Sequence, residues 1–288
     1  MRRFELVEPR SLEEAAGLLA EREDARPIAG GTALLILIKQ GVYIPKTLIN
    51  LKKVDGAGGV SYDPRTGLRV GALTSIYDLE SHPAVRERYP ILSSACHVVA
   101  NIRIRNMATI GGNLAHADYQ SDPPAVLLAL DASVEITSRE GRRELKVSDF
   151  LLGTYETALQ PGELVSALLV PPPPPGLSGN YIKFTTRSSE DRPCAGVAAM
   201  ARMGQGLCEE IRLVVGAVSE RPVRIHKAEE LARGEKITTK LIDQMALEAS
   251  KAVNPIEDLR GPADYKRHVV GVLARRALSA LLQNGGMA

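Results

Sequence analysis

Hydrophobic residues recur at helical spacing close to the start of the chain. Ser11, with Glu14 three residues later, forms a capping box, and apolar residues then follow every three or four positions up to Leu19. This pattern predicts a helix. The next predicted elements are a strand, an apolar helix closed by Gly41 and a second strand, at 26–29, 32–40 and 47–51. The first 55 residues therefore predict a small α/β unit.

The pattern changes at Gly67, where a strand and then two helices are predicted. A polar, glycine-containing stretch at 101–124 interrupts the apolar periodicity. A hairpin is predicted over 133–147, turning at Glu140-Gly141. The other predicted elements here are strands at 68–72 and 164–170 and helices at 75–81, 91–100 and 125–130.

Five consecutive prolines, 171–175, end the last of these strands. Such a run cannot continue a sheet ladder and favours polyproline II, so it predicts a stiff spacer between two domains. We place a first domain at 1–177, with subdomains of about 1–55 and 56–177, and a second at 178–288. The second domain is expected to hold three antiparallel strands, 181–186, 196–203 and 207–218, and then three helices, 223–233, 239–252 and 262–283.

Length, charge and cysteine usage restrict the possible classes of protein. The 288 residues are more than one core usually holds, which agrees with two domains. The 36 Lys and Arg against 34 Asp and Glu indicate neither a nucleic-acid nor an anionic-membrane partner. Residues 1–20 do not form a signal peptide and no apolar run reaches membrane-spanning length, so we expect a cytoplasmic protein without a membrane span. Cys96, Cys194 and Cys208 are too far apart for a disulfide framework or a metal motif and are expected to be buried thiols.

Two turns carry paired glycines, and the first of them lies between a predicted strand and a predicted helix. Gly30-Gly31 stands in the first, where unpaired N–H groups at a helix start favour an anion and the absence of Cβ atoms allows a phosphate to approach. Gly111-Gly112 stands in the second, between Thr109 and Asn113, whose side chains can donate and accept hydrogen bonds. A valine at position 111 is therefore expected to block the approach of a phosphate. Either pair could also be a plain connector.

Other motifs with a known chemistry are missing from the chain. Neither turn, nor Gly56-Ala57-Gly58-Gly59, matches G-x-G-x-x-G, so a Rossmann dinucleotide site is not expected. The sequence has no H-E-x-x-H, G-x-S-x-G, G-x-x-x-x-G-K-[ST] or Cys-x-x-Cys motif. His116, Asp118 and Asp122 are close in sequence, but without a second nearby histidine they favour a loop role over a metal site. We predict no metal ligand and no catalytic side chain.

The second turn and the residues that follow it resemble a known family. The run Ile104-Arg105-Asn106-Met107-Ala108-Thr109-Ile110-Gly111-Gly112-Asn113, then Asp122-Pro123-Pro124, is similar to the FAD-binding medium subunit of carbon monoxide dehydrogenase and the FAD domain of xanthine dehydrogenase. Ala29-Gly30-Gly31-Thr32 fits the family's first glycine turn. The likeness extends from the opening FELVEPRSLEEAAGLLA to the closing Gly261-Pro262-Ala263-Asp264-Tyr265-Lys266.

The resemblance implies an α+β fold: a vanillyl-alcohol-oxidase (PCMH)-type FAD-binding domain of two α/β subdomains, followed by the smaller domain of three strands and three helices. It implies that the first turn holds the FAD pyrophosphate, that Asp122 binds ribityl or ribose hydroxyls and that Lys183 approaches the isoalloxazine. Leu164 and Val165 would lie near the adenine or the ring edge. The implied cofactor-binding residues are Pro27, Ile28, Ala29, Gly30, Gly31, Thr32, Ala33, Leu34, Ala100, Asn101, Ile104, Asn106, Ala108, Thr109, Gly112, Asn113, Asp122, Leu164, Val165 and Lys183.

The implied function is electron transfer inside a molybdenum hydroxylase complex. A large subunit would hold the molybdenum cofactor and a small one two iron–sulfur clusters, as a dimer of heterotrimers, with FAD passing electrons to an external acceptor. The chain departs from the family pattern at Ala33, Ala108, Tyr119-Gln120 and 190–194, where the contacts and the acceptor are expected to differ. Two alternatives stay open: a stand-alone flavin oxidoreductase and an assembly protein that has lost FAD.

Overall fold

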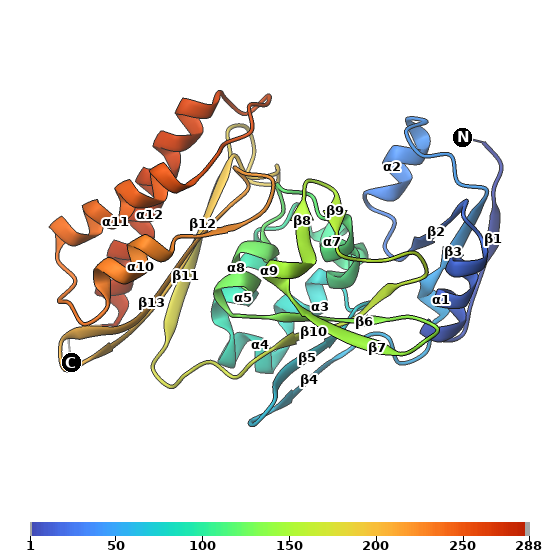
Figure 1. The fold of residues 1–288 in the computed structure, drawn as a ribbon, viewed down its shortest axis with the longest axis horizontal. Helices are drawn as coiled ribbons and strands as arrows, with labels where there is room; N and C mark the ends of the chain where they lie inside the picture. Colours follow the sequence, from blue (N-terminus) through green and yellow to red (C-terminus); the bar gives the residue numbers. More distant parts are fainter. Residues whose placement is uncertain (1, 286–288) are drawn as a thin grey trace.

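Three units, each built on its own sheet, follow one another along the longest axis of the molecule (Figure 1). The structure is a computed structural model that describes residues 2–285. The N-terminal unit has a parallel sheet in the order β1-β3-β2, with β1 Glu5–Val7, β2 Ala25–Ile28 and β3 Thr47–Asn50. Helices α1 Leu12–Glu21 and α2 Leu34–Lys39 and the 3₁₀ turn η1 Leu51–Lys53 complete it.

The helix and the strand, helix and strand predicted between residues 11 and 51 are present as α1, β2, α2 and β3. Ser11 caps α1 as expected, because its hydroxyl accepts the N–H of Glu14 at 3.0 Å, while the Glu14 carboxylate accepts the N–H of Arg10 at 2.7 Å. Strand β1 was not predicted from the sequence. It has three residues and none is fully buried, so it leaves no hydrophobic alternation to detect.

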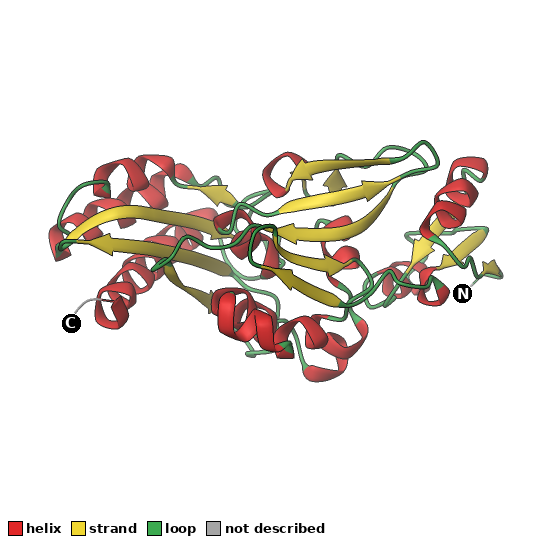
Figure 2. Ribbon diagram, turned by 90° about the horizontal axis from the view of Figure 1, so that it is seen from below, coloured by secondary structure: helices red, strands yellow, loops and turns green. Residues whose placement is uncertain are grey.

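The middle unit has a five-stranded antiparallel sheet with β10 at its centre. Its strand order is β4-β5-β10-β6-β7, and β10 is buried along almost its whole length. Helices line one face of this sheet (Figure 2), and a small two-stranded sheet, β8-β9, lies at one end. The strands are β4 Val60–Asp63, β5 Gly67–Gly71, β6 Ser133–Thr137, β7 Arg142–Lys146, β8 Leu151–Gly153, β9 Glu156–Thr157 and β10 Leu164–Val170, and the helices are α3 Ile76–Ser81, α4 Pro83–Arg88, α5 Pro90–His97, α6 Ile102–Met107, α7 Ile110–His116, α8 Pro123–Ala129 and α9 Val147–Phe150.

The prediction that residues 101–124 interrupt the regular elements is wrong, because this stretch contains the helices α6 and α7. Both helices are short and begin at a side-chain cap: Asn101 accepts the N–H of Ile104 at 3.1 Å, and Thr109 accepts that of Gly112 at 3.1 Å. Their apolar residues are too few to produce a periodic signal. The caps, rather than the hydrophobic pattern, were the available sequence signal.

The C-terminal unit has four strands where three were expected. Strands β11 Ser178–Phe184, β12 Ala195–Gly204, β13 Leu207–Gly216 and β14 Val223–Arg224 form an antiparallel sheet in that order. The predicted start of a helix at 223 is therefore wrong. Val223 pairs with Val215, and helix α10 His226–Ala232 begins only afterwards. Helices α11 Thr239–Ala252 and α12 Ala263–Gly285 complete the unit.

The C-terminal sheet is buried on both faces. Val197, Ala199 and Leu213 share a core with α11 and α12, whereas Ala198, Met200 and Val214 pack into the core of the middle unit. The two sets alternate along β12, as the side chains of a strand must. This packing places β11, and its polar side chains, directly against the helices of the middle unit.

Candidate cofactor site

The first glycine turn presents a row of unused backbone donors. The N–H groups of residues 30–34 find no hydrogen-bond acceptor anywhere within residues 2–285, and Ala33 gives α2 no side-chain cap. All residues from Pro27 to Leu35 remain partly exposed. Successive free N–H groups in a turn form a concave site for an anion. The sequence-predicted role of this turn is thus compatible with its geometry.

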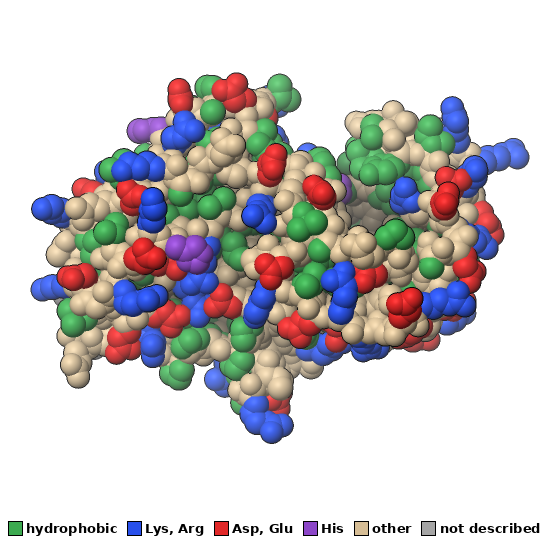
Figure 3. Space-filling view, in the orientation of Figure 1, with side chains coloured by type: hydrophobic (Ala, Val, Ile, Leu, Met, Phe, Trp, Pro, Cys, Tyr) green, Lys and Arg blue, Asp and Glu red, His purple; other side chains and the backbone are tan. Residues whose placement is uncertain are grey.

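Gly30 is the point at which the first turn meets the second. A Cβ atom at Gly30 would overlap the carbonyl oxygen of Met107 and come within 3.0 Å of Ala108 Cα. Gly31 has a φ of +70°, which favours glycine. The two turns, far apart in sequence, therefore touch through bare backbone. Figure 3 shows the surface hollowed between the N-terminal unit and the rest of the molecule.

The second glycine turn uses its N–H groups internally. Gly111 donates to Ala72 O at 2.9 Å, Gly112 to the Thr109 hydroxyl at 3.1 Å, and Asn113 to Thr109 O at 2.9 Å. Gly111 is buried, and a Cβ there would lie 2.8 Å from Ala72 O. The expected reason for needing glycine at position 111 is therefore wrong: the missing Cβ makes room for Ala72, directly after β5, and not for a phosphate.

Several predicted side chains around the second turn hold the local backbone. Asn101 caps α6 and donates to Glu190 of the C-terminal unit at 3.3 Å. Asn106 donates to Ile102 O, and Asn113 accepts from the Ser121 hydroxyl at 2.9 Å. Ala100 has a φ of +43°, an uncommon conformation for alanine, between α5 and α6. Ile104, Ala108, Gly112 and Asn113 stay partly or fully exposed.

Asp122 and Lys183 meet between the middle and C-terminal units. The Lys183 ammonium lies 3.0 Å from Asp122 Oδ2 and donates to Val98 O at 2.7 Å, and the Tyr181 hydroxyl donates to Asp122 Oδ1 at 2.8 Å. Asp122 is only 3% exposed. Burial raises the pKa of its carboxyl to about 6, against the opposing effects of Lys183 and Tyr181. Burial also raises the pKa of Tyr181.

Leu164 and Val165 are buried at the start of β10. Leu164 packs with the core of the N-terminal unit and Val165 with that of the middle unit. They lie where these two units join, and helix α7, which contains the second glycine pair, packs against β10. The structure thus brings together the first turn, the end of α6 and, separately, Asp122 with Lys183.

Two residues that position the site were not singled out from the sequence. Tyr181 lies two residues before Lys183 on β11, so both side chains point to the same face, and this spacing could have identified it. Arg105 is buried, pairs with Glu80 at 2.9 Å and donates to Val99 O at 3.1 Å, which supports the turn ending at Ala100. Glu80 is 25 residues away from Arg105, and nothing local indicates the pairing.

The segments that depart from the family pattern lie in one network. Asp258 accepts from Tyr119 and from Gln120, both at 2.8 Å, and pairs with the buried Lys266 at 2.8 Å. In the 190–194 segment, Asp191 pairs with Arg260 at 2.8 Å and Arg192 with Asp118 at 3.0 Å. The unusual residues of both segments therefore tie the middle unit to the C-terminal unit.

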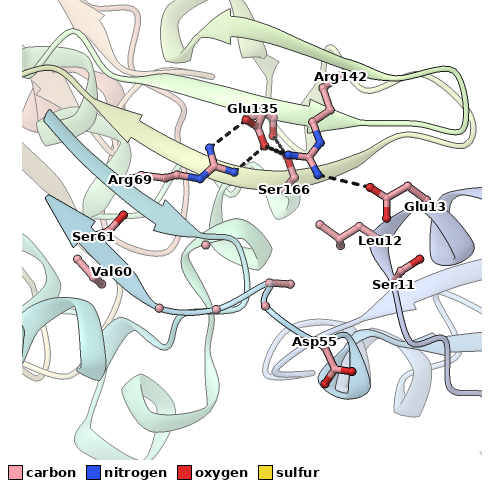
Figure 4. Close-up of a pocket in the computed structure, with 15 residues that line it drawn as sticks. Ser11, Leu12, Glu13, Asp55, Val60, Ser61, Arg69, Glu135, Arg142 and Ser166 are labelled. Carbon is pink, nitrogen blue, oxygen red and sulfur yellow. Dashed lines mark hydrogen bonds and ion pairs between the residues drawn. The ribbon is translucent and has the colours of Figure 1, made fainter. Parts of the chain in front are cut away.

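A cavity of about 450 Å³ lies elsewhere, between α1 and the outer face of the middle sheet (Figure 4). None of the predicted cofactor residues lines it. Arg69 binds Glu135 through two hydrogen bonds of 2.9 Å, and Arg142 reaches both Glu13 and Glu135, at 3.4 and 3.6 Å. The charged side chains that line the cavity are largely paired with one another, and these pairs connect the N-terminal unit to the middle sheet.

The described residues give no indication of a metal centre or of a membrane-spanning segment. No group of three or more His, Cys, Asp or Glu in residues 2–285 could hold a metal ion. His116 instead packs on the Tyr155 ring, with centroids 5.0 Å apart. Cys96, Cys194 and Cys208 are buried and free, as expected. No helix within the same residues is long and apolar enough to cross a membrane.

Comparisons with known proteins cover nearly the whole chain. Residues 2–173 match the family described as FAD binding domain in molybdopterin dehydrogenase, and residues 180–281 match the CO dehydrogenase flavoprotein C-terminal domain. The glyceraldehyde dehydrogenase medium chain of Sulfolobus acidocaldarius is 33% identical over 95% of this chain and 96% of its own length. The carbon monoxide dehydrogenase medium chain of Afipia carboxidovorans is 32% identical over 96% and 95%.

The fold has a close counterpart among solved structures. A chain of carbon monoxide dehydrogenase from Hydrogenophaga pseudoflava, in a form that lacks the Mo-pyranopterin moiety, superimposes with a TM-score of 0.95. It shares 34% identity, and the match covers 99% of both chains. The resemblance inferred from the two glycine motifs is confirmed, and so is the α+β fold of an FAD-binding domain followed by a smaller domain.

Proposed function

Because the chain belongs to the family of FAD-binding domains in molybdopterin dehydrogenases, we propose that it is the electron-transfer subunit of a molybdenum hydroxylase complex. FAD held by this chain would supply the electron carrier between iron–sulfur clusters on a small partner subunit and an external acceptor. A large partner subunit carries the molybdenum cofactor, and the complex is a dimer of heterotrimers in the cytoplasm. In support, relatives that match this chain over nearly their full length are named medium chains.

The observation that carries the proposal is the row of free N–H groups at 30–34. Five donors without an acceptor in the described chain suit the two phosphates of a dinucleotide, and Gly30 and Gly31 leave the backbone accessible. The contact of Gly30 with Met107 fixes this row against the start of the second turn. We assign the pyrophosphate to residues 29–34.

The second turn acts through side chains and apolar surface in this proposal. Its N–H groups are already used and Thr109 is buried as the cap of α7, but Gly112 is exposed and Asn113 partly exposed at this well-supported helix start. Residues 100–113 therefore support the cofactor beside the first turn, with Leu164 and Val165 behind them. FAD, when bound, supplies an electron-accepting ring, and the protein supplies its position and electrostatic environment.

The Asp122–Lys183 pair sets that electrostatic environment. Lys183 is fixed by Asp122 and by Val98 O, two residues before the strained turn at Ala100. A fixed cation stabilises negative charge nearby, which is the charge that a reduced flavin develops. We propose that Asp122 and Tyr181 hold the Lys183 ammonium in place and limit the freedom of its long side chain.

Calorimetric titration with FAD tests the proposal. We expect the purified chain to bind about one FAD, and FMN, which has one phosphate and no adenylate, to bind at least 10-fold more weakly because only FAD fills a diphosphate site. A folded chain that binds neither would refute the FAD site. The complex is tested separately: the natively purified assembly should contain molybdenum and iron with the chain, and their absence would refute the subunit assignment.

A further inference from the structure

Helix α2 is apolar but poorly covered by the rest of the chain. Its sequence is Leu-Leu-Ile-Leu-Ile-Lys, yet only Ile38 is buried. The loop that follows adds three more exposed apolar side chains. We call the set of Ile36, Val42, Tyr43 and Ile44 the α2 patch; Val42 is 66% exposed and Ile44 51%. Hydrophobic side chains gather over α2 on the surface in Figure 3.

A groove and two cations adjoin the patch. The groove, of about 380 Å³, is lined by Arg2, Phe4, Ile38 and Lys39 and by the loop up to Pro45. Within residues 2–285, neither Arg2 nor Lys39 has a carboxylate partner, whereas the nearby Lys46 is paired with Asp24 at 2.7 Å. Apolar side chains with an uncompensated positive rim are typical of a protein interface whose partner is acidic.

The position of the patch relates it to the cofactor site. The free N–H groups lie at the N-terminal end of α2, and the loop 42–44 lies beyond its C-terminal end, about 9 Å away for a six-residue helix. A phosphate bound to the N–H groups lies at one end of α2, and the loop of the patch lies at the other end. A partner docked on the patch would be held beside the flavin.

We propose that the α2 patch docks an acidic, apolar-centred surface of a partner subunit of the complex. The inference rests on the proposed function, since it needs a multi-subunit assembly. Ile44 and Val42 would enter the partner's surface, and Arg2 and Lys39 would face its carboxylates. Burying four large apolar side chains at the centre, with charges at the rim, is the usual anatomy of a stable protein interface.

Variants of the tagged chain, purified from cells that make the whole complex, test the proposal. Molybdenum, iron and FAD are measured per chain for Ile44→Glu, Val42→Glu and Lys39→Glu. Leu247→Glu, on α11 of the C-terminal unit, is the matched control, because Leu247 is 53% exposed. We expect at least a 10-fold loss of molybdenum and iron in the two patch variants and a smaller loss in Lys39→Glu. FAD per chain should stay at the wild-type value.

Three outcomes would overturn the docking site: patch variants that retain both metals, an equal loss in Leu247→Glu, or a wild-type chain that contains neither metal, which would refute the proposed function as well. Hydrogen exchange on the wild-type complex provides a second measurement that requires no variant. Residues 36–44 should exchange more slowly in the complex than in the isolated chain with FAD, and equal exchange would contradict the proposal.

Two other occupants are distinguished by direct assays. Sedimentation of the wild-type chain with phosphatidylglycerol vesicles, abolished by Ile44→Glu, would assign the patch to a lipid surface and overturn the inference. A concentration-dependent dimer of the isolated chain that Ile44→Glu dissociates would assign it to a second copy, with the same consequence. A chain that is monomeric and does not sediment with vesicles agrees with the partner subunit.

Discussion

The two glycine turns look alike in sequence and differ in how their backbone is used. In the first, the N–H groups of residues 30–34 have no acceptor among residues 2–285, and these five residues are partly exposed. In the second, Gly111, Gly112 and Asn113 all donate within the chain. A turn whose donors are free can bind an anion, whereas a turn whose donors are satisfied can only support one.

The difference follows from what surrounds each turn. The second turn packs onto β5 and the segment after it, so its N–H groups meet Thr74 O and Ala72 O. The first turn ends the edge strand β2, and at Gly30 it lies against the backbone of Met107 and Ala108. Paired glycines therefore indicate a close backbone approach in both turns, and tertiary packing decides whether a ligand or the protein itself makes that approach.

Gly30→Ala should have the largest effect on the difference between the two glycine turns. The new Cβ would overlap Met107 O, so the two turns must separate and the row of N–H groups loses its position. We expect FAD affinity, measured by calorimetry, to fall at least 100-fold, which is about 2.7 kcal/mol. Gly58→Ala is the control, since its Cβ meets nothing closer than 3.8 Å. Equal FAD affinity in both variants would contradict the proposed contact.

Gly111→Ala should act on folding rather than on the ligand. Its Cβ would come within 2.8 Å of Ala72 O in a buried place, and overpacking of this kind costs about 1–3 kcal/mol. Urea unfolding of the FAD-free chain should reveal this loss. Gly17→Ala, in α1 with no neighbour closer than 3.8 Å, should be neutral or stabilising. If Gly111→Ala kept the stability of the wild type but lost FAD binding, a phosphate contact would explain the glycine at position 111 and the packing explanation would be wrong.

Asp122 gives a pH dependence that neither turn has. Its pKa is raised to about 6 in the folded chain, so the folded state holds a proton that the unfolded state releases near pH 4. This contribution to stability is present at low pH and is lost as the pH rises through about 6. Between pH 5 and pH 7, the free energy of unfolding of the wild type should fall by on the order of 1 kcal/mol relative to that of Asp122→Asn. A difference that does not change with pH would contradict the raised pKa.

The two threonines beside the glycine pairs give the finest comparison. Thr109→Val removes the hydroxyl that accepts the N–H of Gly112 and should cost about 1 kcal/mol in thermal or urea unfolding. Thr32→Val keeps the backbone N–H, and the Thr32 hydroxyl has no partner among the described residues, so stability and FAD affinity should barely change. A larger effect at Thr32 would show that its side chain, and not its N–H, binds the cofactor.

Local sequence determined much of this protein. Ser11 and Glu14 specified a helix start, Gly141 the hairpin turn and the glycine pairs the points of close approach, because caps and turns depend on neighbouring residues. The motifs around both glycine pairs also identified the family. The domain boundary at 177/178 stays a prediction of the same kind, derived from the proline run.

Tertiary structure decided which groups are free and which are satisfied. Strand β14 forms because Val223 pairs with Val215 in β13. Lys183 contacts Asp122 only because β11 packs against the middle unit. The sequence does not distinguish Gly111 from Gly30, and only the fold shows that the first lies against Ala72 and the second against Met107. A hydrogen-bond donor is satisfied by whatever lies within about 3 Å of it, and residues far apart in sequence reach that distance only through the fold.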